Sequence, residues 1–91
     1  MAWVKLDDNF AEHPKVAGLS DGAFRLHVRA MCYAARLNTM GEVPTGAFRM
    51  LGVTKRLAGE LATAGLWEDT SRGSWAIHDF EVYNPSRETI S

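Results

Sequence analysis

The histidines and the cysteine of this chain are too far apart in the sequence to predict a reactive or metal-binding centre. His13, His27 and His78 lack ligand spacing, and Cys32, the single cysteine, can complete neither a structural zinc site nor an internal disulfide. His78 and Asp79 are neighbours, and neighbouring side chains on a strand point to opposite faces. We therefore expect no catalytic residue, no metal and no cofactor, and a protein that is not an enzyme. His27 is expected to be a hydrogen-bonded core residue.

Positively charged side chains, rather than nucleophiles, mark the middle of the chain. Residues 20–40 hold three arginines against one aspartate, and residues 41–65 hold three cations against two glutamates. The acids gather at the ends, with three against two lysines in residues 1–19 and five against two arginines in residues 66–91. The net charge is −1, whereas nucleic-acid-binding domains usually carry a basic surplus. Any contact with DNA is therefore expected from the middle of the chain.

The size and composition of the chain predict one small packed domain. Its 91 residues are 46% hydrophobic and include three tryptophans, which favours a core over general disorder. We expect a domain over residues 1–85 and a short tail over residues 86–91. No apolar run approaches the roughly 20 residues that cross a bilayer, and the start of the chain lacks the apolar stretch of about seven residues typical of a signal peptide. With one cysteine, the expected location is the reducing cytoplasm, with no membrane contact.

The first half of the chain predicts one long central helix preceded by short elements. Apolar and polar residues alternate over residues 3–6, as in an edge strand, and residues 10–16 favour helical turns interrupted by Pro14. Ser20 is a good N-cap for a mostly apolar helix that ends at about Leu37. Its polar stripe, which we interpret as a solvated face, holds Arg25, Arg29, Cys32 and Arg36.

The next segment predicts two helices joined by a tight turn. The first helix is capped by Thr45 and ends at Leu51, after which Gly52 can adopt a left-handed conformation. Thr54 caps the second helix, residues 55–64. The side chains expected to face the core are Phe48 and Leu51 from the first helix and Leu57, Leu61 and Ala64 from the second, with Ala58 at the edge of that side.

Short strands flank this helix pair. Residues 42–43 precede it, and residues 66–69 and 74–78 follow it as a hairpin, with Gly73 supplying the positive φ of the turn. The order helix, strand, helix, turn, helix and hairpin is typical of a winged helix-turn-helix. We therefore predict an α+β, mostly α fold with a three-helix core and a β-hairpin wing.

Four stretches of the chain, taken in order, resemble a known family. They are W-V-K-L-D-D-N-F-A-E-H-P-K-V near the start, a long alanine-rich helix, G-E-V-P before the second helix, and A-G-L-W-E followed by I-H-D-F-E-V-Y-N-P-S. Together they look like the N-terminal winged-helix domain of phage and actinobacterial replication-initiator or replisome-organiser-like proteins. The resemblance implies DNA binding in replication or transcription regulation, within the host cytosol. Since the family's further C-terminal domain does not follow here, a small phage regulator, or an adaptor on the same fold, is a comparable alternative.

The expected partner is double-stranded DNA, bound by the second helix of the pair, residues 54–64, and by the wing, residues 66–79. That helix would enter the major groove, and about four cations would give a salt slope of roughly −3.6, a modest value for a monomer. Gly59 either admits a close approach of the partner or is simply tolerated. The expected contacts are Lys55, Arg56, Gly59, Glu60 and Thr63 at base edges, Arg49 and Thr54 at phosphates, and Arg72 on the wing.

Two further partners stay open from the sequence. Weak binding by one copy favours a homodimer on two half-sites, with an apolar contact around Trp3, Trp67 or Tyr83. The alternative to DNA binding is a protein-protein interaction adaptor or inhibitor that contacts a host or phage protein. The acidic C-terminal part favours it, and so do the hairpin tryptophans, because tryptophan is enriched at binding hot spots. Trp67 or Trp75 would be its exposed anchor, although core packing is favoured for Trp75.

Overall fold

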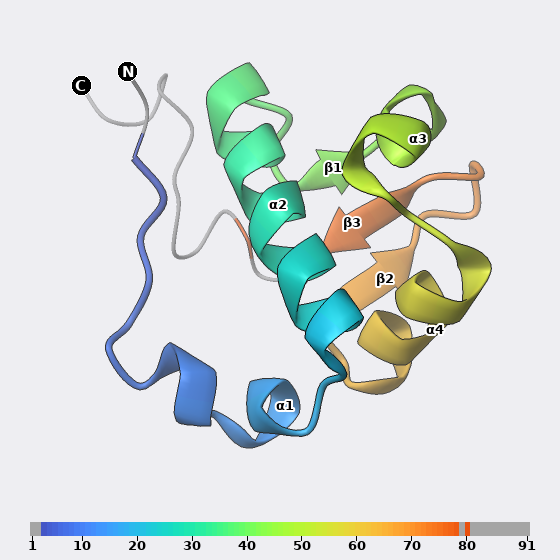
Figure 1. Ribbon diagram of the computed structural model, residues 1–91. Coiled ribbons are helices and arrows are strands. Elements are labelled where there is room, and N and C mark those ends of the chain that lie inside the picture. Colours follow the sequence, from blue (N-terminus) through green and yellow to red (C-terminus); the bar gives the residue numbers. More distant parts are fainter. Residues whose placement is uncertain (1–2, 79, 81–91) are drawn as a thin grey trace.

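The computed structural model of the chain describes residues 3–78 and residue 80. It is an α+β structure, mostly helical, with a small three-stranded antiparallel sheet (Figure 1), which confirms the predicted class. None of the described helices is long and apolar enough to cross a membrane. The described elements are the 3-10 turn η1 (Phe10–Glu12), α1 (Pro14–Ala17), α2 (Asp21–Leu37), β1 (Glu42–Val43), the 3-10 turn η2 (Thr45–Ala47), α3 (Phe48–Leu51), α4 (Lys55–Thr63), β2 (Trp67–Asp69) and β3 (Trp75–Ile77).

Helix α2 is the central element of the molecule (Figure 1). Its first turn is capped by Ser20, whose Oγ accepts a hydrogen bond from the backbone N–H of Ala23 at 3.2 Å, and it ends at Asn38, which adopts a left-handed conformation. The predicted helix and its N-cap are thus confirmed. The predicted solvated stripe is exposed as expected, and the buried face is rich in alanine, which lets neighbouring elements approach the α2 backbone closely. The buried apolar residues of α2 are Ala23, Leu26, Ala30, Met31 and Ala34.

The sheet has the strand order β1-β3-β2, so that β3 pairs with both of its neighbours. Val43 lies opposite Trp75 in the first pair, and Trp67 lies opposite Ile77 in the second. Gly73 in the turn between β2 and β3 has a φ of +84°. The predicted hairpin and its glycine are confirmed.

The hydrophobic core joins α2, α4 and the sheet. Its largest fully buried side chains are Trp67, Leu61 and Val43. One predicted core position is wrong: Ala64, expected on the apolar side of the helix, is only half-buried because α4 ends before it, whereas Ala58, expected at the edge of that side, is buried. The buried residues of α4, Ala58 and Leu61, therefore lie nearer the middle of the helix than the sequence predicts.

The start of the helix pair also differs from expectation. The predicted cap, Thr45, is itself the first residue of η2, and the extended residue before it is Pro44, which makes no side-chain capping bond. The chain forms a 3-10 turn first and α3 only afterwards, so α3 is a short helix. Leu51 is buried and Gly52 is left-handed with a φ of +83°, both as predicted.

The edge strand predicted for residues 3–6 is wrong. This segment is not a strand, and of its side chains only Val4 is half-buried. Alternation of apolar and polar residues indicates that one side of a segment is covered, but a strand also needs a neighbour for its backbone. In this segment one side is covered because Val4 packs directly against the core, as Phe10 does further along the chain, and not because a strand pairs with it.

Candidate nucleic-acid interface

Helix α4 presents a polar face because its apolar side is fixed against α2 and the core. The helix is capped by Thr54, whose Oγ1 accepts from the backbone N–H of Leu57 at 3.1 Å. The Leu57 side chain reaches to 3.3 Å from the position that a Cβ would take on Gly22 of α2, and Leu61 is fully buried. The side that faces outward holds Lys55, Arg56, Gly59 and Thr63.

The carboxylate of Glu60 takes a different role from the base-facing one expected of it. Its Oε2 accepts from the backbone N–H of Ser20 at 2.6 Å, and its Oε1 accepts from the Ser20 hydroxyl at 2.8 Å. The pKa of the Glu60 carboxyl lies below its ordinary value, because the backbone N–H and then the hydroxyl of Ser20 stabilise the ionised form. Glu60 therefore fixes α4 to the first turn of α2, and the only acid of α4 is withdrawn from its outward face.

Gly59 lies at the middle of the outward face of α4, and a Cβ added there would meet nothing within 4 Å. Since no neighbour requires a glycine, replacing Gly59 with alanine is expected to raise the free energy of unfolding by about 1 kcal/mol, the usual difference between the two residues inside a helix. Chemical denaturation followed by circular dichroism measures this gain.

The control for Gly59→Ala is Gly52→Ala, which makes the same chemical change at a residue with a φ of +83°. This variant should be less stable than the wild type, because an L-residue is strained in the left-handed region. Equal effects at the two positions would show that Gly59 is not an ordinary helical residue.

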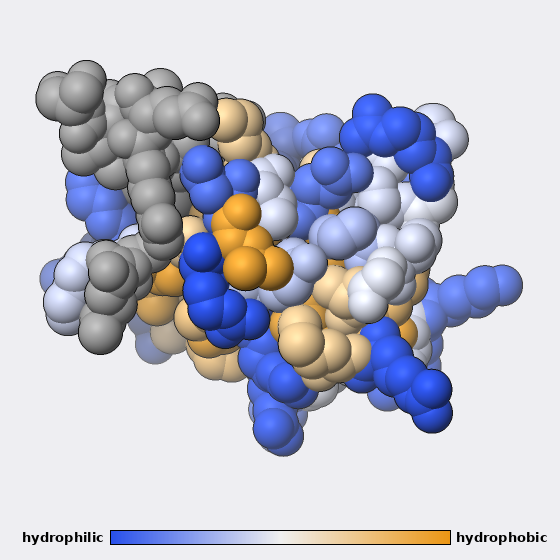
Figure 2. All heavy atoms as spheres, turned by 90° about the horizontal axis from the view of Figure 1, so that it is seen from above, coloured by the Kyte–Doolittle hydropathy of each residue, from blue (hydrophilic) through white to orange (hydrophobic). Residues whose placement is uncertain are grey.

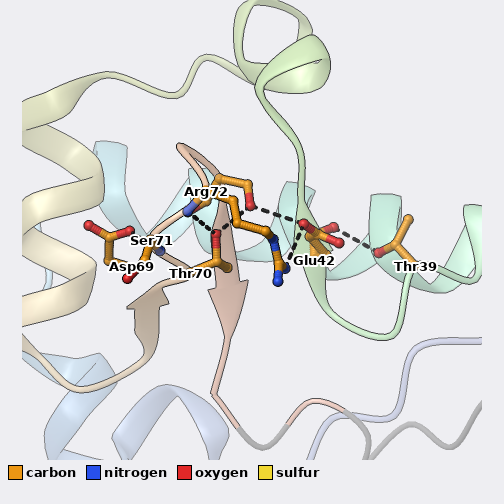
Figure 3. A network of polar contacts seen from close by, with 7 residues as sticks. Thr39, Glu42, Asp69, Thr70, Ser71 and Arg72 are labelled. Atoms are coloured by element: carbon orange, nitrogen blue, oxygen red, sulfur yellow. Dashed lines mark hydrogen bonds and ion pairs between the residues drawn. The ribbon is translucent and has the colours of Figure 1, made fainter.

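The tip of the β2–β3 hairpin is held by a network of polar contacts (Figure 3). Arg72 Nη2 lies 3.3 Å from Glu42 Oε2 on β1, and the Ser74 hydroxyl donates to the same oxygen at 3.0 Å. The hydrogen bond from Ser74, and then that from Arg72, lowers the pKa of the Glu42 carboxyl below its ordinary value. The remaining contacts order the turn itself, with the Ser71 N–H donating to Asp69 Oδ1 at 2.8 Å. Arg72 is exposed as expected, but it already has a carboxylate partner.

The structure brings some of the predicted contact residues together and keeps others apart. Lys55, Arg56 and Thr63 share α4 with Gly59, whereas Arg49 is exposed on α3. The hairpin tip lies beside the start of η2, since the Thr45 methyl group would be 3.8 Å from a Cβ on Gly73. The expected contact residues are therefore spread over α4, α3 and the hairpin, which lie along one side of the molecule in Figure 1.

Arg29 has a structural role that the sequence did not indicate. Its Nη2 donates to the backbone carbonyl of Met50 at 2.9 Å, in the last turn of α3. The final carbonyls of a helix lack partners within the helix, and a cation there is favourable. Because the two residues are 21 positions apart, no local pattern could have revealed this contact. Arg29 therefore connects α3 to α2 and is not simply part of a solvated stripe.

His27 on α2 and Trp67 on β2 form a buried hydrogen-bonded pair between the helix and the sheet. Trp67 Nε1 donates to His27 Nδ1 at 3.0 Å, and both residues are only 2% exposed. Phe10 covers the imidazole with a nearly parallel ring, 5.9 Å between centroids. Burial lowers the pKa of His27 to about 4, so the ring is neutral at physiological pH. The predicted core histidine is confirmed, and Trp67 cannot be an exposed anchor or a dimer contact.

Among the described residues, exposed apolar side chains do not form a continuous patch on the face at the C-terminal end of α2. Where described residues form this face, Figure 2 shows it as mostly hydrophilic, with a few apolar residues between the polar ones. Among the large apolar residues, Leu37, Met40 and Met50 are about half exposed, and Trp3 is 85% exposed. Tyr83, the other residue predicted at a dimer contact, lies outside the described residues. The charges are unevenly distributed along the chain, since residues 14–63 hold seven cations against three acids.

No group of three or more histidines, cysteines or acids that could hold a metal ion occurs within residues 3–78 and 80. No family model matches the chain, and neither does any curated protein or solved structure.

Proposed function

We propose that the chain is a winged helix-turn-helix domain that binds double-stranded DNA in the cytoplasm, with α4 in the major groove and the β2–β3 hairpin as the wing. The order of elements from α2 to β3 and the strand order β1-β3-β2 support this arrangement. The observation that carries the proposal is the outward face of α4. It presents Lys55 and Arg56 while the only carboxylate of the helix is bound to Ser20.

The other predicted contacts have chemistry that suits the phosphate backbone. The Thr54 hydroxyl accepts from Leu57 N–H and still has its own O–H to donate to a phosphate. Arg49 on α3 and Arg72 on the wing are exposed guanidinium groups, which bind phosphate well. Following the family resemblance, we place this binding in a phage-type replication or transcription regulator.

The test is fluorescence anisotropy of a labelled random-sequence duplex, titrated with protein between about 50 and about 200 mM salt. A random-sequence duplex is bound without a specific base sequence, so Lys55 and Arg56 would neutralise phosphates there instead of reading base edges. The double variant Lys55→Gln, Arg56→Gln should therefore bind this duplex more weakly and reduce the slope of log K against log salt by about 1.8, since each lost phosphate contact changes it by about 0.9.

The matched control is Arg25→Gln, Arg36→Gln, which removes the same charge from exposed positions on α2. The control should retain most of the affinity. An equal loss in the two double variants would mean that binding follows net charge and not the face of α4, and absence of binding at the lower salt concentration would refute the proposal.

The competing function is a protein-interaction adaptor on the same fold. The burial of Trp67 removes the anchor that the sequence suggested for it, and Trp75 is only half exposed. Absence of DNA binding would favour this function. The exposed aromatic residue Trp3 would then be replaced to test whether it contacts the partner protein.

A further inference from the structure

A groove of about 610 Å³ separates α1 from the polar face of α4. One of its walls is made by Pro14, Lys15 and Leu19, and the other by Arg56, Gly59 and Thr63. Gly18 and Gly59 line the groove without a side chain that could fill it. The groove thus runs beside the very residues proposed to contact DNA.

The α1 wall is held firmly in place. His13 Nδ1 accepts from the Lys15 N–H at 3.1 Å and so caps α1, while Val16 is buried against the body of the protein. Upstream, Phe10 stacks on His27, and downstream, Ser20 is bound to Glu60 of α4. Contacts on both sides of α1 therefore fix its distance from α4.

The side chain of Lys15 crosses from α1 to the end of α4. Its Nζ lies 3.4 Å, and its Cε 3.6 Å, from the position that a Cβ would take on Gly65, which follows the C-cap of α4. The end of a helix carries the partial negative charge of its unpaired carbonyls, which favours a cation there. Because Gly65 has no side chain, the ammonium group can lie over the backbone there. Lys15 is exposed, and it lines the groove together with Ala64, the residue before Gly65.

The charges around the groove suit an anion. Lys15 and Arg56 supply one cation from each wall, Thr63 supplies a hydroxyl, and the one acid, Glu60, already accepts two hydrogen bonds from Ser20. We infer that this groove holds the sugar–phosphate backbone of the duplex that α4 binds, with Lys15 as a phosphate contact on the flank of the recognition helix. The inference rests on the proposed function, and it extends the interface to an element outside the helix pair and the wing.

The inference is tested with Lys15→Gln in the same anisotropy titration with a random-sequence duplex. We expect weaker binding and a salt slope reduced by about 0.9, so that the loss of affinity between about 50 and about 200 mM salt shrinks roughly three- to fourfold. Lys15→Arg should restore both the affinity and the slope. Thermal unfolding of each variant shows whether the fold is retained.

Combining Lys15→Gln with Arg56→Gln separates this inference from the proposal on which it rests. If the two residues hold different phosphates, the double variant should reduce the slope by about 1.8. A Lys15→Gln protein that is folded and binds with the wild-type affinity and slope, while Arg56→Gln weakens binding, would overturn the inference and leave the proposed function standing. Absence of DNA binding by the wild type would overturn both.

Discussion

Replacing Trp67 with alanine is expected to lower the free energy of unfolding by about 3–5 kcal/mol, the usual cost of removing a large aromatic side chain from a core. Trp67 is one of the largest fully buried side chains, and its ring is packed against Trp75 at 6.2 Å between centroids. Since small domains are stable by only about 5–15 kcal/mol, this variant should be largely unfolded at moderately raised temperature. Urea unfolding followed by circular dichroism measures the effect.

Two further variants show which part of Trp67 matters. Trp67→Phe keeps a buried ring but leaves His27 Nδ1 without its donor, and an unsatisfied buried acceptor costs about 1–3 kcal/mol. Trp3→Ala is the control at a position that is 85% exposed, where a change within about 0.5 kcal/mol is expected. A Trp67→Ala protein as stable as Trp3→Ala would contradict the burial of this residue.

Acidification is expected to destabilise the protein before its carboxylates are protonated. The pKa of His27 is about 4 in the folded protein, against an ordinary value of 6.5. Between these two values the unfolded chain binds a proton that the folded protein does not, so stability falls as the pH falls. The full difference corresponds to about 3 kcal/mol, reached near pH 4, whereas above about pH 6.5 the effect is absent.

The pH dependence is assigned by comparing the wild type with His27→Asn. The asparagine Oδ1 can take the place of Nδ1 as the acceptor for Trp67, but asparagine does not titrate. The free energy of unfolding of this variant should therefore depend less on pH between about 6.5 and about 4.5. Glu42 and Glu60, whose pKa values are lowered, affect stability only as the pH falls below the ordinary carboxyl range. Identical pH profiles for the two proteins would contradict the assignment to His27.

The elements that were predicted correctly are those defined by local chemistry. Ser20 and Thr54 cap their helices through bonds to residues three positions away, and Gly52 and Gly73 adopt the left-handed conformations that their places require. These signals lie within one turn of the chain, so the sequence was enough to locate α2, α4 and the hairpin. The error at residues 3–6 has the same origin, because alternation alone does not reveal whether a neighbouring strand exists.

The contacts that determine the candidate interface were not predictable in this way. Glu60 binds Ser20, and Trp67 binds His27, each across 40 residues of sequence. Periodicity placed Glu60 on the polar face of α4, but it could not show that α2 begins within reach of its carboxylate. For the same reason the sequence left Trp67 open between core and surface, and gave no indication that Lys15 reaches the end of α4.

Because Arg72 is paired with Glu42, a phosphate that binds Arg72 must compete with the Glu42 carboxylate for the guanidinium group. To bind DNA through Arg72, the protein must exchange one anionic partner for another, so fewer salt ions are released than the number of cations at the interface suggests. Ser74 donates to the same carboxylate oxygen and would continue to do so after the exchange, which leaves Glu42 solvated and partnered. If the wing contacts DNA as proposed, Glu42 would compete with the phosphates for Arg72, so that a well-placed phosphate would displace it and a poorly placed one would not.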